Sequence, residues 1–585
     1  YLASIGINVI LTVVWNSSGA DGDYTLYPSQ VMNESFGRTM HPAIPVGRDP
    51  LKRIIIEAHR NGMEVFPWFE MGFATSYSQN GGHILQQYPS WALMDSQGNL
   101  VVKNGFDWMS PIHPEVQEFI LSLVTEVVDN YDVDGIEFSD RIPAMPVEGG
   151  YEPSTRSLYA AENDGAEPPA NYNDPAWMCW RADKLTEFNK AARDSVKACS
   201  EHIIFSSSPS VYPWSYQEYL QDSKTWVEQD IVDNIIPQVY RRNFNDYRFE
   251  MDKSLSYIPQ DKKNIFFSGM LIYLKRPGYL ISPEFLLNSI ELNRDRGVMG
   301  EAFFFYEGLR RNNDQLGDTL KATYYSQPAL NPHRHGNVWR PKALIVNEDD
   351  PDVVISGSWD TRTGNDGFEP DFLSNNDSEY ASISYYFDVP YSAWFDVFAY
   401  IVNKPVGTSQ APYTVYSDSD STRIHLDQKG FYSGGWQPVG TIYLSAGRHK
   451  VLKLSNENVP AGEYVFADAA MLMINRKKSP DVIVTDVGQK KEITESKPVS
   501  FELGQNYPNP FNSKTTIRFK LAYPGLVNLT LFDVLGREVA VLINEEKTAG
   551  THTLQFDATG LSSGIYIYKM RTADSVQFRR MIYLK

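Results

Sequence analysis

The stretch YDVDGIEFSDRIPAMPVEGGY, residues 131–151, joins a short buried-strand pattern to an acidic loop that contains an arginine. Val133 to Phe138 is too short for a helix, and the turn-forming pair Asp134-Gly135 opens it. Barrel enzymes of the (β/α)8 type keep their catalytic carboxylates at the C-terminal ends of the strands. The stretch therefore predicts such a barrel. The polar residues at or just beyond this strand end are Glu137, Ser139, Asp140 and Arg141.

Residues 1–330 alternate short β-rich runs with helical patterns, which is typical of repeated βα units. The clearest helix runs from Pro114 to Val128 and has one apolar face. We expect a TIM-type (β/α)8 barrel whose first strand is missing. The chain begins at Tyr1 rather than Met, so we also expect an N-terminal truncation that removed any signal peptide. The seven predicted strands are Val9–Trp15, Met63–Phe69, Val133–Phe138, Ile203–Ser207, Ile235–Tyr240, Ile265–Met270 and Met299–Phe305.

Beyond the barrel the pattern changes to alternation with turn punctuation, and no helix-length periodicity remains. Residues 343–475 predict an antiparallel β-sandwich, as in the run WFDVFAY from Trp394. The polar, lysine-rich residues 476–498 predict a linker. Residues 499–585 again show short strands with Gly and Pro turns. The predicted fold class is therefore multidomain, with a barrel followed by two all-β sandwich domains.

Composition restricts the classes of partner. The 585 residues carry a formal net charge of -19, which disfavours nucleic acid and anionic membrane surfaces. No apolar run approaches the ~20 residues of a transmembrane segment. Only Cys179 and Cys199 are present, so no disulfide framework is expected. Aromatic residues make up 13% of the chain, which permits stacking on sugar rings but also fits large β-rich cores.

Several blocks within residues 1–330 resemble the bacterial glycosyl-hydrolase-like family 10 barrels that carry a proline-rich insertion after strand four. The resemblance implies a glycoside hydrolase and favours a bacterial glycan, such as peptide-free peptidoglycan strands, as its substrate. That branch reads Asp-Asp-Arg where this chain has Ser139-Asp140-Arg141, so the first of two adjacent acids is absent. The blocks are FPWFEMGF, SPIHPEVQEFI, DGIEFSDRIPAMPVEGGY, DPAWMCWRADKL, SSPSVYPWSYQEYLQD, IIPQVYRRNF and FFFYEGL.

Two further resemblances cover most of the remaining chain. Residues 343–474 are similar to golvesin-type domains, through VNEDDPDVVISGSW, APYTVYS, GGWQPVGTIYL and FADAAMLMI. Carbohydrate binding is the role suspected for that family. Residues 499–585 resemble the type A C-terminal sorting domain of the type IX secretion system, through QNYPNPFNSKTTIRF, LFDVLGREVAVL and the terminal RRMIYLK. This implies a Bacteroidetes-type source, the type IX secretion machinery as a partner, and a secreted or cell-surface protein.

Glycosidic cleavage usually needs two carboxyl groups that flank the scissile bond. Three acids follow predicted strands and are the candidate catalytic residues: Asp140, Glu307 and Glu70. The charge of Arg141 would hold Asp140 ionised, whereas burial of Glu307 among residues 303–306 would raise its pKa and suit an acid/base. Glu70 would bind substrate or substitute for another carboxylate. The alternative is that Asp140 and Arg141 form a structural ion pair.

Substrate-binding residues are expected at the same strand ends. Aromatic side chains there could form the floor of a sugar subsite, although any one of them could instead belong to the core. Gln238 could bind a hydroxyl or acetamido group, or a neighbouring strand end. Glu137 lies within a strand and would need a partner such as Arg241 or Arg242. The predicted substrate-binding set is Trp68, Glu137, Arg141, Trp214, Gln238, Tyr240 and Tyr306.

No histidine spacing indicates a metal site, and no cofactor is expected. The acidic cluster Glu348, Asp349, Asp350 and Asp352 could bind Ca²⁺, but it lacks the spacing of a known calcium loop, and a solvated turn is the simpler interpretation. The sequence therefore predicts a secreted or surface-attached glycoside hydrolase that cleaves O-glycosidic bonds of a polysaccharide by a two-carboxylate mechanism. The alternative is a non-catalytic surface protein that binds glycan with a barrel that lost an acid at Ser139.

Overall fold

The computed structural model describes residues 1–16, 24–298, 300–327, 329, 340–430, 434–480, 502–506, 508–521, 525–533, 537–548, 550–572 and 576–585. The chain forms two units, Tyr1–Val487 and Gly488–Lys585. The predicted linker at 476–498 lies outside the described residues from 481 onward. The predicted domain boundaries stay predictions.

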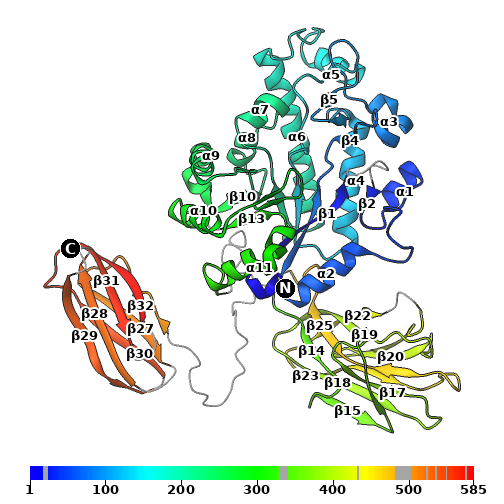
Figure 1. Ribbon diagram of the computed structural model, residues 1–585, viewed down its shortest axis with the longest axis vertical. Coiled ribbons are helices and arrows are strands. Elements are labelled where there is room, and N and C mark those ends of the chain that lie inside the picture. Colours follow the sequence, from blue (N-terminus) through cyan, green and yellow to red (C-terminus); the bar gives the residue numbers. More distant parts are fainter. Residues whose placement is uncertain are drawn as a thin grey trace. The chain divides into compact units, whose positions relative to one another are not determined.

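The first domain is built on parallel strands with helices between them (Figure 1). Hydrogen bonds join the first five in the order β1-β3-β7-β8-β9, and β10 pairs with β13. Parallel bridges from Ile235 to Phe266 and from Gln238 to Gly269 continue the order from β9 to β10. Each strand overlaps one predicted strand, while an eighth strand and closure of the barrel stay predictions. The strands are β1 (Val9–Asn16), β3 (Glu64–Phe69), β7 (Gly135–Phe138), β8 (Ile204–Ser207), β9 (Asn234–Ile235), β10 (Ser268–Leu271) and β13 (Glu301–Phe304).

The intervening helices bury the apolar faces that the sequence indicates. Helix α4 begins at Pro114, and its predicted face, from Val116 to Val127, is buried. In α2 the Asp49 side chain accepts a hydrogen bond from the Lys52 N–H, which caps the first turn. The helices are α2 (Pro50–Arg60), α4 (Pro114–Asn130), α6 (Pro175–Cys199), α8 (Ser223–Glu228), α9 (Phe244–Ser256), α10 (Pro283–Asp295) and α11 (Glu307–Ala322).

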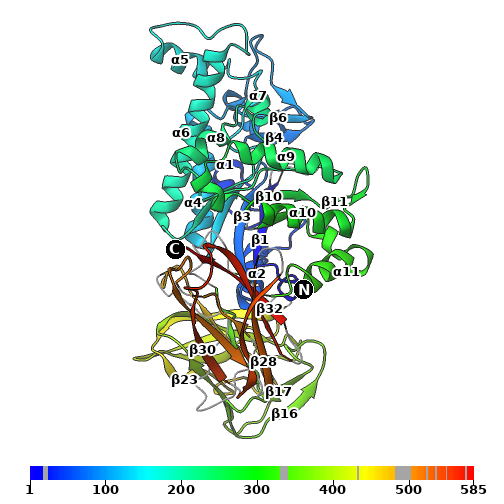
Figure 2. The same cartoon turned by 90° about the vertical axis from the view of Figure 1, so that its left-hand side faces the viewer.

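Additional segments follow the C-terminal ends of β3, β7 and β8. A small antiparallel sheet comes after β3, and a proline-rich insertion with α5 (Pro153–Glu162) comes after β7. The insertion is tied to α7 (Trp214–Tyr219), because the Met145 N–H donates to the Tyr219 carbonyl over 2.9 Å. Figures 1 and 2 place these segments at one end of the domain. The small elements are α1 (Gln30–Phe36), α3 (Gly82–Gln87), β2 (Tyr24–Thr25), β4 (Ala74–Tyr77), β5 (Val102–Lys103), β6 (Phe106–Trp108), β11 (Tyr273–Leu274) and β12 (Tyr279–Leu280).

The rest of the first unit is a β-sheet domain with its own hydrophobic core. One sheet has the order β14 (Leu344–Val346), β25 (Ala470–Ile474), β19 (Ala393–Ile401) and β22 (Gly435–Leu444). A second has the order β15 (Val353–Ser356), β18 (Ser382–Val389), β23 (Gly447–Ser455), β20 (Ala411–Tyr416) and β21 (Ser421–Leu426). A third comprises β16 (Asp360–Thr363), β17 (Asp371–Asn375) and β24 (Val465–Ala467).

The second unit is another β-sheet domain, and its core is separate from the others. Alternate residues of β28, namely Val527, Leu529 and Leu531, are buried, as the period of two predicts. One sheet has the order β26 (Glu502–Leu503), β27 (Lys514–Leu521) and β30 (Gly550–Asp557). The other has the order β29 (Glu538–Lys547), β28 (Gly525–Asp533), β31 (Gly564–Arg571) and β32 (Val576–Tyr583).

Candidate active site

Arg141 joins two of the predicted catalytic carboxyls at the ends of neighbouring strands. Glu70 directly follows β3, and Asp140 follows β7, and these strands pair in parallel up to Phe69 and Phe138. The Arg141 Nη2 donates to Glu70 Oε1 over 3.0 Å, and its Nη1 lies 3.7 Å from Asp140 Oδ1. All three side chains are 14 to 29% exposed, so a ligand could reach them. The structure thus brings together Glu70, Asp140 and Arg141.

The backbone between these groups is tightly fixed. The Ser139 hydroxyl donates to the Glu70 carbonyl over 2.8 Å and accepts the Arg141 N–H over 3.1 Å. A Cβ on Gly72, whose φ is +60°, would lie 2.2 Å from the Arg141 carbonyl oxygen. The Arg141 guanidinium also stacks on the Phe106 ring at 4.6 Å. Ser139, which replaces the expected acid, is therefore part of the loop's hydrogen-bonding framework.

Glu137 is completely buried in β7, one level below these groups. Its exposed fraction is 0%, and within the described residues neither carboxyl oxygen has a well-formed hydrogen bond. Burial raises the pKa of Glu137 to about 7, against a smaller opposing effect of the Ser206 and Ser208 hydroxyls. The prediction that Arg241 or Arg242 pairs with Glu137 is wrong. Arg241 pairs instead with Glu250 at 2.7 Å. The other candidate, Arg242, stacks on Tyr279.

The pKa of the Tyr240 phenol is influenced by three carboxyl groups. Its pKa is raised well above the usual range, first by burial and then by the charges of Asp140, Glu137 and Glu70. Burial also raises the pKa of Glu70, and nearby Asp140 adds to that rise while Arg141 opposes it. Tyr240 and Glu70 thus both lie within the electrostatic influence of Asp140.

Aromatic rings from three strand ends lie against one another beside the acids. The Trp68 and Phe304 rings meet edge to face with centroids 6.2 Å apart, and Phe304 stacks on Tyr240 at 5.4 Å. Trp68 and Tyr240 were predicted, whereas Phe304 was not singled out within the FFFYEGL block. The Trp68 indole nitrogen has no hydrogen-bond partner in the described part of the chain. This row could face the apolar side of a sugar.

The expected burial of Glu307 is wrong. The chain turns into α11 at this residue, so the carboxyl lies in the first helical turn and its side chain is 50% exposed. There it pairs with Arg311 at 3.3 Å, an arrangement that suits a charged helix N-terminus. Tyr306, also predicted as a substrate-binding residue, is likewise 50% exposed. Glu307 is therefore not the buried acid/base that the sequence predicts.

The remaining predicted residues have mixed surroundings. The Gln238 side chain donates to the Ser208 carbonyl over 3.2 Å, which is the strand-end contact left open above. Trp214 is 44% exposed and lies 5.7 Å from the Tyr219 ring. Tyr219 was missed, yet its pKa is raised to about 12, chiefly by burial and next by Asp140. A tyrosine at the end of a short helix carries no distinctive sequence signal.

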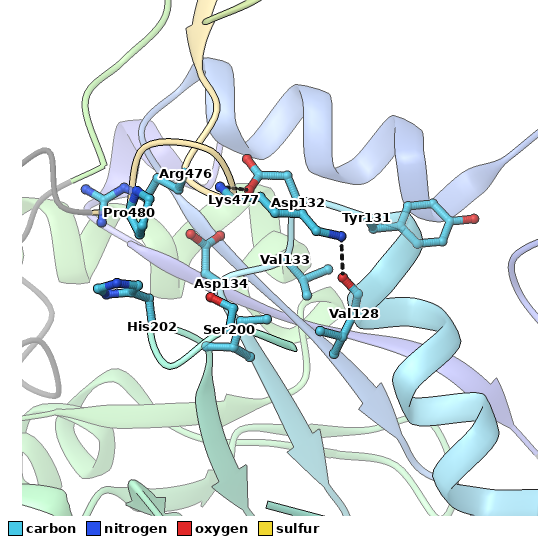
Figure 3. Close-up of a pocket in the computed structure, with 11 residues that line it drawn as sticks. Val128, Tyr131, Asp132, Val133, Asp134, Ser200, His202, Arg476, Lys477 and Pro480 are labelled. Atoms are coloured by element: carbon cyan, nitrogen blue, oxygen red, sulfur yellow. Dashed lines mark hydrogen bonds between the residues drawn. The ribbon is translucent and has the colours of Figure 1, made fainter. Parts of the chain in front are cut away.

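A pocket lies at the other end of the parallel strands, next to the start of β7 (Figure 3). Its cavity volume is about 30 Å³, and Asp132, Asp134, His202 and Lys477 are among the residues that line it. In (β/α)8 barrels, the fold predicted for this domain, this end usually contributes stability rather than catalysis. Within the described ranges, no three His, Cys, Asp or Glu side chains are grouped as a metal site. None of the described helices has the length and apolar character needed to cross a membrane.

Comparisons with known proteins agree with this division of the chain. Residues 1–275 match the family Glycosyl hydrolase-like 10, residues 343–474 match the Golvesin C-terminal domain, and residues 505–584 match the Secretion system C-terminal sorting domain. The first domain is thus a glycosyl hydrolase-like domain. The chain as a whole joins it to a golvesin C-terminal domain and a secretion sorting domain, which implies export.

Curated relatives of the first domain are named glycosyl hydrolases. The chain is 25% identical over 343 residues to glycosyl hydrolase YngK of Bacillus subtilis, covering 52% of this chain and 62% of the relative. It is 26% identical over 262 residues to glycosyl hydrolase DigH of Escherichia coli K12, covering 41% and 56%. The chain therefore spans little more than half of these relatives. The PgaB (BpsB) glycoside hydrolase domain of Bordetella bronchiseptica aligns at 14% identity and a TM-score of 0.43, covering 55% of this chain and 90% of that one.

Proposed function

We propose that the protein is a secreted or cell-surface glycoside hydrolase in which Asp140 and Glu70 are the reacting carboxyls. The observation that carries the proposal is the pairing of Glu70 and Asp140 with one guanidinium, that of Arg141, at the ends of neighbouring parallel strands. Acids gathered at strand C-termini are a feature of barrel active sites. Their position beside an aromatic row suits cleavage of a bond between sugars.

The two carboxyls have different surroundings, which suits different roles. Asp140 precedes Arg141 and would act as the ionised nucleophile or base. Glu70, whose pKa is raised chiefly by burial, would donate the proton to the leaving oxygen and so replaces Glu307 in that role. One guanidinium spans both groups, at 3.0 and 3.7 Å. This keeps the carboxyl oxygens within the ~9.5 Å upper limit of glycosidase pairs.

Glu137 supports the site without touching the substrate, since its side chain is fully buried. It acts through Tyr240, whose phenol it affects electrostatically. Trp68 and Tyr240 would contact a sugar ring, with Trp214, Gln238 and Tyr306 as further contacts along the glycan. A TIM-type barrel closed by an eighth strand would hold this arrangement.

The substrate is proposed to be a polysaccharide, with peptidoglycan glycan strands as the first candidate because of the family resemblance. The golvesin domain would hold the enzyme to glycan, and the sorting domain would engage the type IX secretion machinery. No cofactor is required by a two-carboxylate mechanism.

The test is release of reducing ends from denuded peptidoglycan strands, chitin oligomers, and plant and algal polysaccharides. We expect Asp140→Asn and Glu70→Gln to lower kcat by about 10²–10⁴-fold on the one glycan that is cleaved. Glu307→Gln should stay within a few-fold of the parent protein. A loss confined to Glu307→Gln would refute the assignment of Glu70.

One observation favours a second function, glycan binding without cleavage. Ser139 stands where the related branch has an acid, and its hydroxyl is fully engaged with the loop backbone. In that case the same glycan panel would show binding, for instance by retention on insoluble polysaccharide, with no reducing ends from any member. Asp140→Asn would then weaken binding rather than turnover.

A further inference from the structure

Two acidic side chains are buried in the golvesin domain where β14 and β25 separate. The last pair of their antiparallel ladder joins Val346 to Ala470. Glu348 lies two residues beyond Val346, and Asp468 lies two residues before Ala470, so the register places them opposite each other. Their exposed fractions are 3% and 2%. Such burial requires a compensating partner for each carboxyl.

The charged groups with the largest effect on the pair are themselves acids. The charged groups that act on Glu348 are Asp468, Asp349 and Glu369, and Glu369 also acts on Asp468. Asp468 Oδ1 and Oδ2 accept the N–H groups of Ala469 and Phe368, both over 2.8 Å. Glu348 Oε2 is buried and has no hydrogen-bond partner within the described ranges. The acids thus repel one another and are only partly compensated.

Asn347, next to Glu348 in the chain, and the turn at Gly367, which contacts Asp468, offer further oxygen atoms. The Asn347 side chain donates its amide hydrogen to Asp349, but its Oδ1 is buried and has no partner among the described residues. A Cβ on Gly367 would lie 2.4 Å from the Glu369 carbonyl oxygen and 3.0 Å from Asp468 Oδ2. Gly367 therefore lies between the Glu369 carbonyl oxygen and the Asp468 carboxylate, and a side chain there would collide with both.

The arrangement leaves two ways to compensate the buried acids. One is a retained proton, and burial does raise the pKa of both Glu348 and Asp468 to about 7. The other is a cation. A shared proton would satisfy one carboxyl oxygen and leave Asn347 Oδ1 unpaired, whereas a cation can draw on all these oxygens.

We propose that Glu348 and Asp468, together with the amide oxygen of Asn347 and neighbouring main-chain oxygens, bind one Ca²⁺ ion. Every donor in the set is oxygen, which Ca²⁺ prefers, and two carboxylates can be completed by carbonyls and water to a shell of 6–8 ligands. The ion would fasten the turn after β14 to the turn before β17 and to the start of β25. Affinities of ~10⁻⁴–10⁻³ M are typical of extracellular calcium modules.

The test uses the full chain after treatment with EDTA. Thermal unfolding is followed with CaCl₂ or MgCl₂, and Tb³⁺ luminescence is excited through nearby tyrosines such as Tyr385, whose hydroxyl bonds the Asp468 carbonyl. We expect CaCl₂ to raise Tm and to displace Tb³⁺, and Glu348→Gln and Asp468→Asn to weaken Ca²⁺ binding at least tenfold. Asp388→Asn, which removes an acid with a 69% exposed side chain in the same domain, should bind as the parent does.

Glu348→Gln is the decisive variant, because Glu348 Oε2 has no partner whose loss would disturb the fold. Asp468→Asn removes an acceptor of two main-chain N–H groups and could unfold the domain for that reason alone. An unchanged Ca²⁺ affinity in Glu348→Gln, or no Ca²⁺-dependent rise in Tm of the parent protein, would overturn the proposal. Either result would assign the pair to a shared proton.

Discussion

At the scale of single residues, Glu137 has the most unusual environment of the candidate site. A carboxyl with 0% exposure and no well-formed hydrogen bond in the described structure costs stability when it is ionised. Natural proteins accept such costs mainly at functional sites. The pH dependence of stability should therefore report directly on this residue.

We expect Glu137→Gln to be more stable than the parent protein at neutral and higher pH. The pKa of Glu137 is raised to about 7 in the native state, so its protonated form stabilises the fold fully below pH ~4.5 and this contribution is lost as pH rises through 7. Between pH 4 and 8 the difference in free energy of unfolding should shift by about 3 kcal/mol in favour of the glutamine variant. Urea unfolding across this range measures it. Glu118→Gln, an exposed acid on α4, is the control, and parallel curves for parent and Glu137→Gln would contradict the argument.

The sequence could predict some residues of the site better than others. Glu70, Asp140 and Arg141 follow strands, and the parallel pairing of β3 and β7 brings strand ends together without further information. The surroundings of Glu307 could not be predicted, because the start of α11 decides whether its carboxyl faces the core or solvent. Tyr219 comes from a separate insertion, and its approach depends on tertiary contacts.

At the scale of elements, the loops after β3 and β7 act as one unit. The Phe73 N–H donates to the Arg141 carbonyl over 2.9 Å, and the Arg141 Nε donates to the Glu70 carbonyl over 3.0 Å. Gly72 makes this close contact possible, since its φ of +60° and missing Cβ leave room for the opposite backbone. The position of Arg141 between the two acids thus depends on a glycine outside the ion pair.

Gly72→Ala should destabilise the protein by about 2 kcal/mol or more and reduce any glycosidase activity or glycan binding. The added Cβ would lie 2.2 Å from the Arg141 carbonyl oxygen, so the two loops must separate. The matched control is Gly37→Ala, which has a similar φ of +66° but nothing within 4 Å of the added Cβ. Gly37→Ala should therefore lower the free energy of unfolding only through backbone strain, by about 1 kcal/mol. Equal losses in the two variants by urea unfolding would show that the contact with Arg141 is unimportant.

The regular elements were predicted more accurately than the segments between them. The seven strands and the helix from Pro114 could be predicted from the spacing of hydrophobic residues, because that spacing is a local property of the sequence. The sheet of β4, β6 and β5 was not predicted, because its strands of two to four residues are too short to show alternation. This sheet supplies Phe106, on which Arg141 stacks. Because the sheet was not predicted, Phe106 was not predicted as a site residue either.

At the scale of the molecule, a buried ion cluster connects the first domain with the golvesin domain inside the first unit. Asp134, at the start of β7, accepts from Arg340 Nη2 over 2.6 Å and lies 2.8 Å from His59 Nε2. Arg340 and Asp134 have side chains that are only 1% exposed, and Arg340 also reaches the Ile474 carbonyl at 3.5 Å. Asp134 borders the pocket of Figure 3, at the end of the strands opposite the candidate site. The cluster thus joins the strand that carries Asp140 to the last strand of the next domain.

Arg340→Met should lower the free energy of unfolding by about 3–5 kcal/mol, because it leaves Asp134 buried without its main cation. The golvesin domain should then unfold separately from the first domain, so that the one thermal transition expected for the first unit becomes two in calorimetry. Arg448→Met is the matched control. Its ion pair with Asp352 has the same 2.6 Å separation, but the arginine side chain is 49% exposed, and such surface pairs contribute little to stability. Adding Asp134→Asn to Arg340→Met should recover part of the loss, since the uncompensated charge is removed. A single transition of the first unit at the parent's Tm in Arg340→Met would mean that the apolar contacts between its two domains, such as that of Ile56 with Phe398 and Trp436, couple their unfolding instead of this cluster.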